Sequence, residues 1–120
     1  MTVLRIVTDI GAADVSEVRR LYQDLLDLDV LMGLGWIVTL SSCITMTVQL
    51  SVASGGGSGA PGPDMSIEVD DVDQIYWRAK AQGVPIVYEL VDEPWGVRRF
   101  FLRDPAGKLL NILMHRESES

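Results

Sequence analysis

The chain has 120 residues, of which 48% are hydrophobic and 22% are charged, and its formal net charge is −7. A chain of this size can bury one modest core, so we expect one small globular domain. The acidic balance argues against a nucleic-acid partner, because binding to a phosphate backbone depends on clustered Lys and Arg side chains. Neutral or cationic small molecules are the expected partners.

The first residues carry no sign of export. Residues 1–20 lack the basic start, long apolar run and small-residue cleavage site of a secretory signal. No apolar stretch approaches the roughly 20 residues that a membrane-spanning helix needs. The single Cys43 cannot form an intrachain disulfide, and no His lies near it in the sequence, so we expect a small buried hydrophobe rather than a nucleophile. These features predict a cytoplasmic protein without a membrane partner.

In chain order, the sequence repeats one pattern of elements. A strand-like run at residues 3–10 precedes an amphipathic stretch at residues 14–26, and a run at residues 65–70 precedes a second amphipathic stretch at residues 71–82. Each pair leads into three further strand-like runs. Equivalent positions of the two repeats align along the sequence if the second repeat has a longer loop at residues 89–95. The sequence therefore predicts two βαβββ modules.

Capping residues mark where both helices begin. Asp14 precedes Glu17 by three residues, and Asp71 precedes Gln74 by the same spacing. Side chains at these two places can satisfy backbone N–H groups that the first helical turn leaves without a partner. The sequence therefore predicts helices that start at these aspartates.

Gly and Pro residues separate the modules and close a hairpin. Residues 54–63 read SGGGSGAPGP and have no periodicity, which predicts a flexible linker. Residues 104–107, Asp-Pro-Ala-Gly, predict a tight turn between two strands. The domain organisation that follows is a first module at residues 1–53, the linker at 54–63, a second module at 64–115 and a polar tail at 116–120.

Alternation along the strand-like runs separates the two faces of the expected sheet. In residues 65–70 the apolar positions suit packing under a helix, whereas Glu68 and the preceding Asp64 belong to the opposite face. Val7 and Asp9 take the equivalent places in the first run. The face away from the helices is therefore polar and acidic.

The closing strands add two amides to this face. Gln49 and Asn111 occupy equivalent positions in the two repeats. Amides in strands also face solvent or support a dimer contact, which is the structural alternative. A polar set that lines a concave surface near aromatic side chains is typical of a small-molecule site.

Aromatic residues stand beside the polar set. Trp36 and Trp95 come before the third strand of each repeat, and Arg99 shares its alternation with Phe101. Flat aromatic walls suit planar ligands, and a cationic ring would also be attracted by the acidic residues. Arg99 is free to meet an anionic group or to neutralise one of the acids. The tryptophans have a structural alternative as core or interface anchors.

These features closely resemble one known group of proteins. The paired βαβββ modules and the run DEPWGVRRFFLRDPAGKLLN at residues 92–111 are similar to the vicinal-oxygen-chelate superfamily, which includes glyoxalase I, extradiol dioxygenases and bleomycin-resistance proteins. The P-W-G and D-P-x-G stretches look most like the antibiotic-binding branch. The resemblance implies an α+β fold in which a curled mixed sheet forms a concave cleft, with helices on the outer face and a twofold homodimer.

The resemblance also implies where a metal would bind. Metal-dependent members place their ligands on strands one, four, five and eight, and those places fall on Val7, Gln49, Asp64 and Asn111. Valine offers no donor and amides are weak donors, so we expect neither a metal nor another cofactor. A lone His115 cannot replace several ligands.

Three functions remain open on the sequence. The first is binding of a small planar or cationic molecule, such as an antibiotic or a metabolite, without chemistry. The second is a metal-independent lyase or isomerase in which Glu68 or Asp64 is the base and Arg99, Gln49 or Asn111 stabilises an oxyanion. The third is an accessory protein that binds only other proteins.

Overall fold

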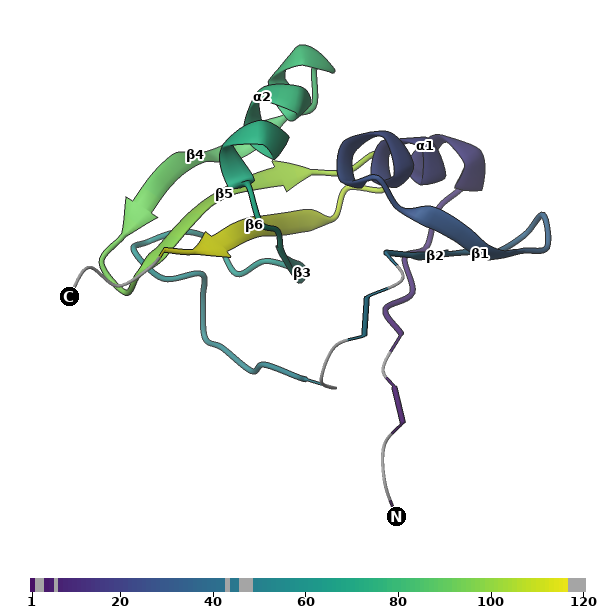
Figure 1. Ribbon diagram of the computed structural model, residues 1–120, viewed down its shortest axis with the longest axis horizontal. Coiled ribbons are helices and arrows are strands. Elements are labelled where there is room, and N and C mark those ends of the chain that lie inside the picture. The colour runs from purple at the N-terminus through teal and green to yellow at the C-terminus, as the bar shows by residue number, and fades with distance from the viewer. Residues whose placement is uncertain (2–3, 6, 43, 46–48, 117–120) are drawn as a thin grey trace. The chain divides into compact units, whose positions relative to one another are not determined.

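A computed structural model of the chain describes residues 1, 4–5, 7–42, 44–45 and 49–116 (Figure 1). The predictions for Cys43 and for most of the tail lie outside the described residues. The chain divides into two compact units, Met1–Ala53 and Ser54–Ser120, which we call unit 1 and unit 2. Neither helix that the structure describes combines the length and the apolar character needed to cross a membrane.

Unit 1 contains a helix and a short hairpin. Helix α1 covers Val15–Leu26, and the Asp14 carboxylate caps it by accepting a hydrogen bond from the Glu17 N–H at 3.2 Å, which confirms the predicted start. Strand β1, Asp29–Gly33, pairs antiparallel with β2, Val38–Ser41.

The other strands predicted for the first module are not found among the described residues. Residues 4–5, 7–10, 44–45 and 49–53 form no strand, and the sheet of unit 1 contains only β1 and β2. Leu4 and Val7 stay exposed, at 87% and 51% of their full accessible area. A sequence with alternating apolar residues forms a strand only where a neighbouring strand makes hydrogen bonds to its backbone N–H and C=O groups. The described part of unit 1 contains no strand that pairs with these residues.

Unit 2 has the predicted βαβββ order. Its elements are β3 (Met65–Glu68), α2 (Val72–Ala81), β4 (Ile86–Glu93), β5 (Val97–Arg103) and β6 (Leu109–His115). The strand order is β3-β6-β5-β4, with β3 parallel to β6 and the other pairs antiparallel, so this sheet is mixed and open.

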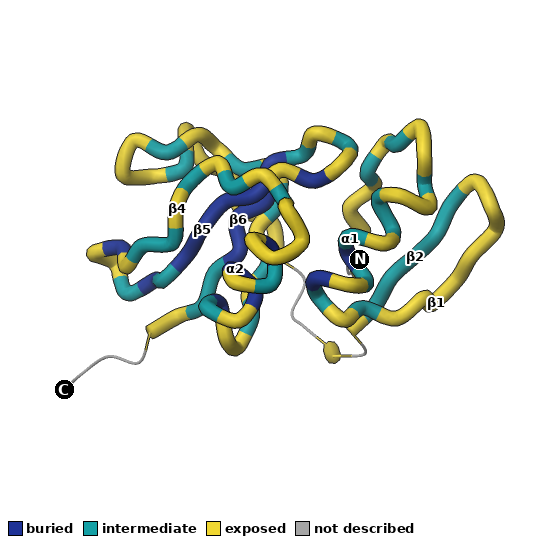
Figure 2. Tube along the Cα trace, turned by 90° about the horizontal axis from the view of Figure 1, so that it is seen from above, coloured by how far each residue is buried: buried dark blue, intermediate teal, exposed yellow. Residues whose placement is uncertain are grey.

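The core of unit 2 lies between α2 and one face of its sheet. Tyr76 on α2 meets Phe100 on β5 edge to face, with ring centroids 5.1 Å apart. Phe100, Leu102 and Ile112 are fully buried, and Figure 2 shows the buried stretch along β5 and β6. Helix α2 therefore covers one face of this sheet, as the alternation predicts (Figure 1).

The prediction of a loop at residues 89–95 is wrong. Strand β4 continues to Glu93, and its pairing with β5 shifts register twice, between Ile86 and Tyr88 and between Tyr88 and Val91. Such irregularities place an extra residue in one strand and change which face the following side chains reach. The additional residues of the second repeat thus lengthen an irregular strand.

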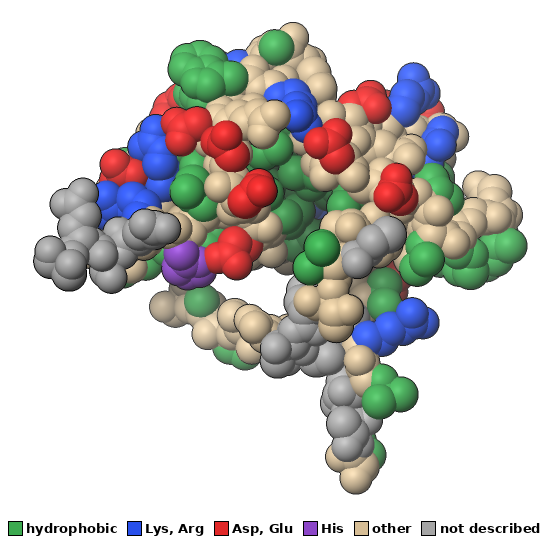
Figure 3. Space-filling model, viewed as in Figure 1, with side chains coloured by type: hydrophobic (Ala, Val, Ile, Leu, Met, Phe, Trp, Pro, Cys, Tyr) green, Lys and Arg blue, Asp and Glu red, His purple; other side chains and the backbone are tan. Residues whose placement is uncertain are grey.

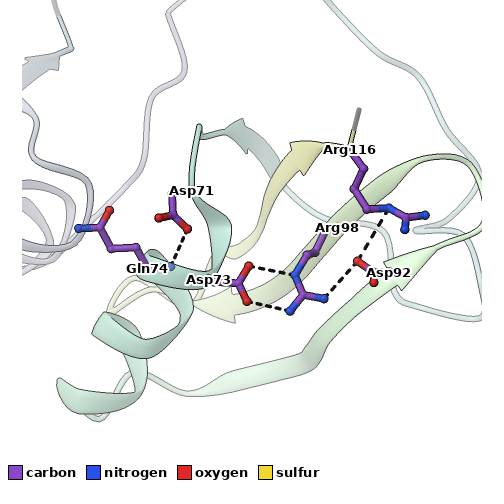
Figure 4. A network of polar contacts seen from close by, with 6 residues as sticks. All are labelled: Asp71, Asp73, Gln74, Asp92, Arg98 and Arg116. Atoms are coloured by element: carbon purple, nitrogen blue, oxygen red, sulfur yellow. Dashed lines mark hydrogen bonds and ion pairs between the residues drawn. The ribbon is translucent and has the colours of Figure 1, made fainter. Parts of the chain in front are cut away.

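A polar clip joins α2 to the sheet (Figure 4). Arg98 on β5 donates from Nε and Nη2 to the two carboxylate oxygens of Asp73 on α2, at 3.0 and 2.7 Å, and from Nη1 to Asp92 at 3.1 Å. Hydrogen bonding from Arg98 lowers the pKa of Asp73. Next to this clip, Asp71 caps α2 by accepting from the Gln74 N–H, as predicted.

Replacing Asp73 with asparagine should therefore weaken folding in a pH-dependent way. A carboxyl whose pKa is lower in the folded state stabilises that state above its unfolded pKa of about 3.9, and this stabilisation is lost as the pH falls through the folded pKa. Because the Asp73 and Arg98 side chains are 46% and 29% exposed, we expect a loss of at most about 1 kcal/mol near pH 7. Urea denaturation near pH 7 and again near pH 2 measures it; an equal difference at both pH values would contradict the assignment.

Candidate functional site

The face of the unit 2 sheet opposite α2 carries polar and aromatic side chains, and we call it the polar face. Phe101 pairs with Asn111, Arg99 pairs with Leu113, and Asn111 and Leu113 pair in turn with Ser66 and Glu68 on β3. The polar and aromatic side chains of the polar face include Ser66, Glu68, Tyr88, Glu93, Arg99, Phe101, Asn111 and His115. Three strand pairs thus bring together residues that lie far apart in the sequence.

Arg99 lies at the centre of an aromatic cage. Its guanidinium carbon is 5.2 Å from the ring centroid of Tyr88, 5.1 Å from that of Trp95 and 4.9 Å from that of Phe101. A cation over aromatic faces is stabilised more strongly when water is excluded, and Arg99 is only 4% exposed. The structure therefore brings together three of the residues that the sequence singled out, Trp95, Arg99 and Phe101.

Glu93 balances the charge of this arginine. Its Oε2 accepts from Arg99 Nε at 2.8 Å and lies 2.6 Å from Nη2, and it also accepts from the Tyr88 hydroxyl at 3.1 Å. Glu93 is 3% exposed, so the pair is buried. Glu93 is five residues from Tyr88, a spacing that a regular strand places on opposite faces; the register shift between Tyr88 and Val91 allows both to reach Arg99.

Part of the Gly-rich segment lies against this cluster. Arg99 Nη2 donates to the Gly57 carbonyl at 3.3 Å, and the Ser58 hydroxyl donates to Glu93 Oε1 at 3.3 Å. A Cβ atom at Gly57 would lie 3.0 Å from the Trp95 ring, so a glycine suits this close approach. Two residues of the segment at 54–63 therefore form one wall of the cage.

Asn111 has an unused acceptor. Its Nδ2 donates to the Ser66 hydroxyl at 3.1 Å, while its Oδ1 is buried and has no hydrogen-bond partner among the described residues. Asn111 is 8% exposed, whereas the neighbouring Ser66 is exposed. A buried acceptor without a donor costs free energy, so this atom marks a place where a further group would be stabilised.

The two carboxylates predicted for the site have partners of their own. Asp64 Oδ2 accepts from the backbone N–H of Leu109 at 2.8 Å, which ties the start of β3 to β6. Glu68 contacts the imidazole of His115, and Figure 3 shows the single histidine beside an acidic side chain. Glu68 and His115 line an open depression of about 370 Å³ with Val69, Asp70 and Met114.

The remaining four predicted site residues belong to unit 1. Val7, Asp9 and Gln49 are exposed and lie outside any helix or strand. Trp36 is 75% exposed in the turn between β1 and β2. Trp95 occupies the matching turn between β4 and β5 of unit 2, so the repeat relationship of the two tryptophans is confirmed. The structure describes these four residues within unit 1.

The residues at the expected metal positions do not fit a metal ion. Val7 has no donor atom, Gln49 and Asn111 offer only neutral amide oxygens, and Asp64 alone would bring a charge. Within the ranges that the structure describes, no three His, Cys, Asp or Glu side chains gather in a way that could hold a metal. We therefore derive no chemistry through a metal.

Sequence reasoning missed three members of the polar face. The sequence did not predict the positions of Glu93 and Tyr88, because the pairing of β4 with β5 is irregular and residues 89–95 were expected to form a loop. From the sequence, His115 is considered only as a metal ligand, but its even spacing from Asn111 on β6 and the parallel neighbour β3 place it near Glu68. The strand pairing was the missing signal.

Comparisons with known proteins agree with this architecture. The family described as the Glyoxalase/Bleomycin resistance protein/Dioxygenase superfamily matches residues 4–112. The chain therefore belongs to this superfamily. A comparison with curated proteins found no match.

Solved structures share the fold at low sequence identity. TioX from Micromonospora sp. ML1 has a TM-score of 0.66 and 20% identity, over 97% of this chain and 99% of that one. A protein of unknown function from Agrobacterium tumefaciens str. C58 has a TM-score of 0.68 and 21% identity, over 95% and 96% of the two chains. A lactoylglutathione lyase from Agrobacterium tumefaciens has a TM-score of 0.60 and 21% identity, over 86% and 87%.

Proposed function

We propose that the chain binds a small planar organic molecule on the polar face of unit 2, without a metal and without changing the molecule. The observation that carries this proposal is the cluster of Trp95, Arg99 and Phe101, whose rings and guanidinium are held in place by Glu93 and Gly57. Preorganised aromatic and polar groups of this kind favour ligand binding, because little conformational freedom is lost when the ligand arrives.

Trp95 gives the ligand a surface to contact. One side of its ring lies near Arg99, yet the residue is 51% exposed, so much of it remains open. Planar molecules gain from stacking on such a surface. An antibiotic or a metabolite with a flat ring system is the ligand class that this surface suits, as in the antibiotic-binding proteins that the PWG and DPAG stretches resemble.

A second candidate function rests on the contact between Glu68 and His115. A carboxylate that contacts an imidazole at the edge of a depression can move a proton to or from a bound molecule, which is what a metal-independent lyase or isomerase needs. Under this alternative the ligand would leave the site changed.

One experiment separates the two candidates. The purified chain is titrated with a panel of planar antibiotics and heteroaromatic metabolites while tryptophan fluorescence is followed, and each compound is then recovered and its mass measured. Binding without conversion gives a saturable fluorescence change and an unaltered mass. The variant Trp95→Ala should lose that change, whereas the control Trp77→Ala on α2 should keep it. A converted compound would favour the enzyme, and the absence of saturable binding would count against both.

We also propose that the chain forms a homodimer. Strands β3 and β4 are unpaired edges of the unit 2 sheet, and unit 1 exposes large apolar residues that include Leu31, Trp36 and Leu50. A second copy would cover such edges and apolar area. Light scattering after size exclusion should give twice the 13.2 kDa of one chain at micromolar concentration, and a monomer would contradict the proposal.

A further inference from the structure

We infer that the ligand of the polar face is not a cation and donates a hydrogen bond, through an N–H or O–H group, to Oδ1 of Asn111. This inference rests on the proposed function and specifies the chemistry of its ligand. It draws on two observations, the occupied cation cage and the acceptor that lacks a donor.

The cage of Tyr88, Trp95 and Phe101 already contains a cation. Arg99 fills it, and Glu93 neutralises that charge at 2.6 to 2.8 Å. A cationic ligand cannot take the faces of these rings that Arg99 occupies without displacing the guanidinium and leaving a buried charge without its partner, which is costly. Two of the three acidic residues that predicted a cationic ligand have partners as well, since Asp64 accepts from a backbone N–H and Glu68 contacts His115.

Asn111 supplies the specific contact. Its amide nitrogen is bound to Ser66, which fixes the carboxamide, and its Oδ1 is left without a donor. A ligand acceptor placed there would face another acceptor, whereas a ligand donor would satisfy the atom. Because hydrogen bonds to buried groups discriminate strongly between matched and unmatched ligands, the unsatisfied oxygen selects for a donor.

The neighbours of Asn111 indicate the direction of approach. Phe101 on one side is fully buried, while Ser66 on the other side is exposed. The ligand therefore enters from the Ser66 side, over the edge of the sheet that β3 forms.

One bicyclic scaffold tests the inference. We choose 2-quinolone, which carries an N–H donor, 1-methyl-2-quinolone, which lacks it, and 1-methylquinolinium, which is a cation. Binding to the ¹⁵N-labelled full chain is followed by chemical-shift changes of the Trp95 indole N–H, which the Asn111 variants keep. The inference predicts that 2-quinolone binds about tenfold more tightly than its methylated form, as expected for one hydrogen bond to a buried group, and more tightly than the cation.

Variants separate a hydrogen bond from a steric effect. Asn111→Leu keeps a similar volume but removes the acceptor, so the preference for 2-quinolone should disappear; Asn111→Asp keeps an acceptor oxygen and should retain it. If the preference persists in Asn111→Leu, or if the two quinolones bind the unaltered chain equally, the inference is overturned while ligand binding stands. If the cation binds best, the inference is likewise overturned. If none of the three binds at millimolar concentration, the proposed function loses its support together with the inference.

Discussion

Replacing Glu93 with alanine is expected to lower the free energy of unfolding of unit 2 by about 3–5 kcal/mol. The carboxylate and Arg99 are 3% and 4% exposed, and the substitution leaves the guanidinium buried without a counter-charge. It also removes the acceptor of the Tyr88 and Ser58 hydroxyls. Denaturant titration followed by circular dichroism measures the change.

A double variant distinguishes loss of the pair from loss of a charge. Replacing both Glu93 and Arg99 with leucine removes the ion pair and fills the space with apolar atoms, so it should cost much less than Glu93→Ala. Asp70→Ala, at an exposed carboxylate of the same unit, serves as the control and should change little. A loss for Glu93→Ala no larger than that of the control would show that the buried pair does not stabilise the fold.

Replacing Asp104 with alanine is expected to cost about 2–4 kcal/mol, because a buried carboxylate is the acceptor for two backbone groups of the turn. Its Oδ1 accepts from the N–H of Ala106 at 2.9 Å and from that of Lys108 at 2.8 Å, and the residue is 4% exposed. These bonds hold the hairpin between β5 and β6, the two strands that carry Arg99 and Asn111. The same denaturant titration measures the loss.

Asp104→Asn is the matched control for the turn. Asparagine keeps an oxygen that can accept both bonds, so it should lose clearly less stability than alanine. Equal losses for the two variants would mean that the charge, and not the acceptor geometry, decides the stability of this turn.

The local patterns of unit 2 could be predicted from the sequence because their causes are local. Asp71 caps its helix within four residues, and the Asp-Pro-Ala-Gly turn closes on itself through Asp104. The alternation shared by Arg99 and Phe101 is confirmed, since both side chains lie on the polar face, whereas Phe100 between them meets Tyr76 on the α2 side. Each of these features depends on the few residues around it.

Features that depend on partners distant in the sequence could not be predicted. One is the hydrogen bond that the Asp64 carboxylate accepts from the Leu109 N–H, because only the parallel pairing of β3 and β6 brings these residues close. The role of Glu93 depends on the irregular register between β4 and β5. The alternating pattern of residues 3–10 predicted a strand for which the described part of this run has no pairing partner. A sequence pattern cannot show whether a neighbouring strand is present.

The measurement that tests the central claim most directly is a crystal structure of the chain with the tightest-binding compound of the planar panel. The account predicts unaltered ligand density on the polar face of unit 2, in contact with Trp95 and with a donor group at Oδ1 of Asn111. Ligand density elsewhere on the chain, or a chemically altered molecule beside Glu68 and His115, would contradict it.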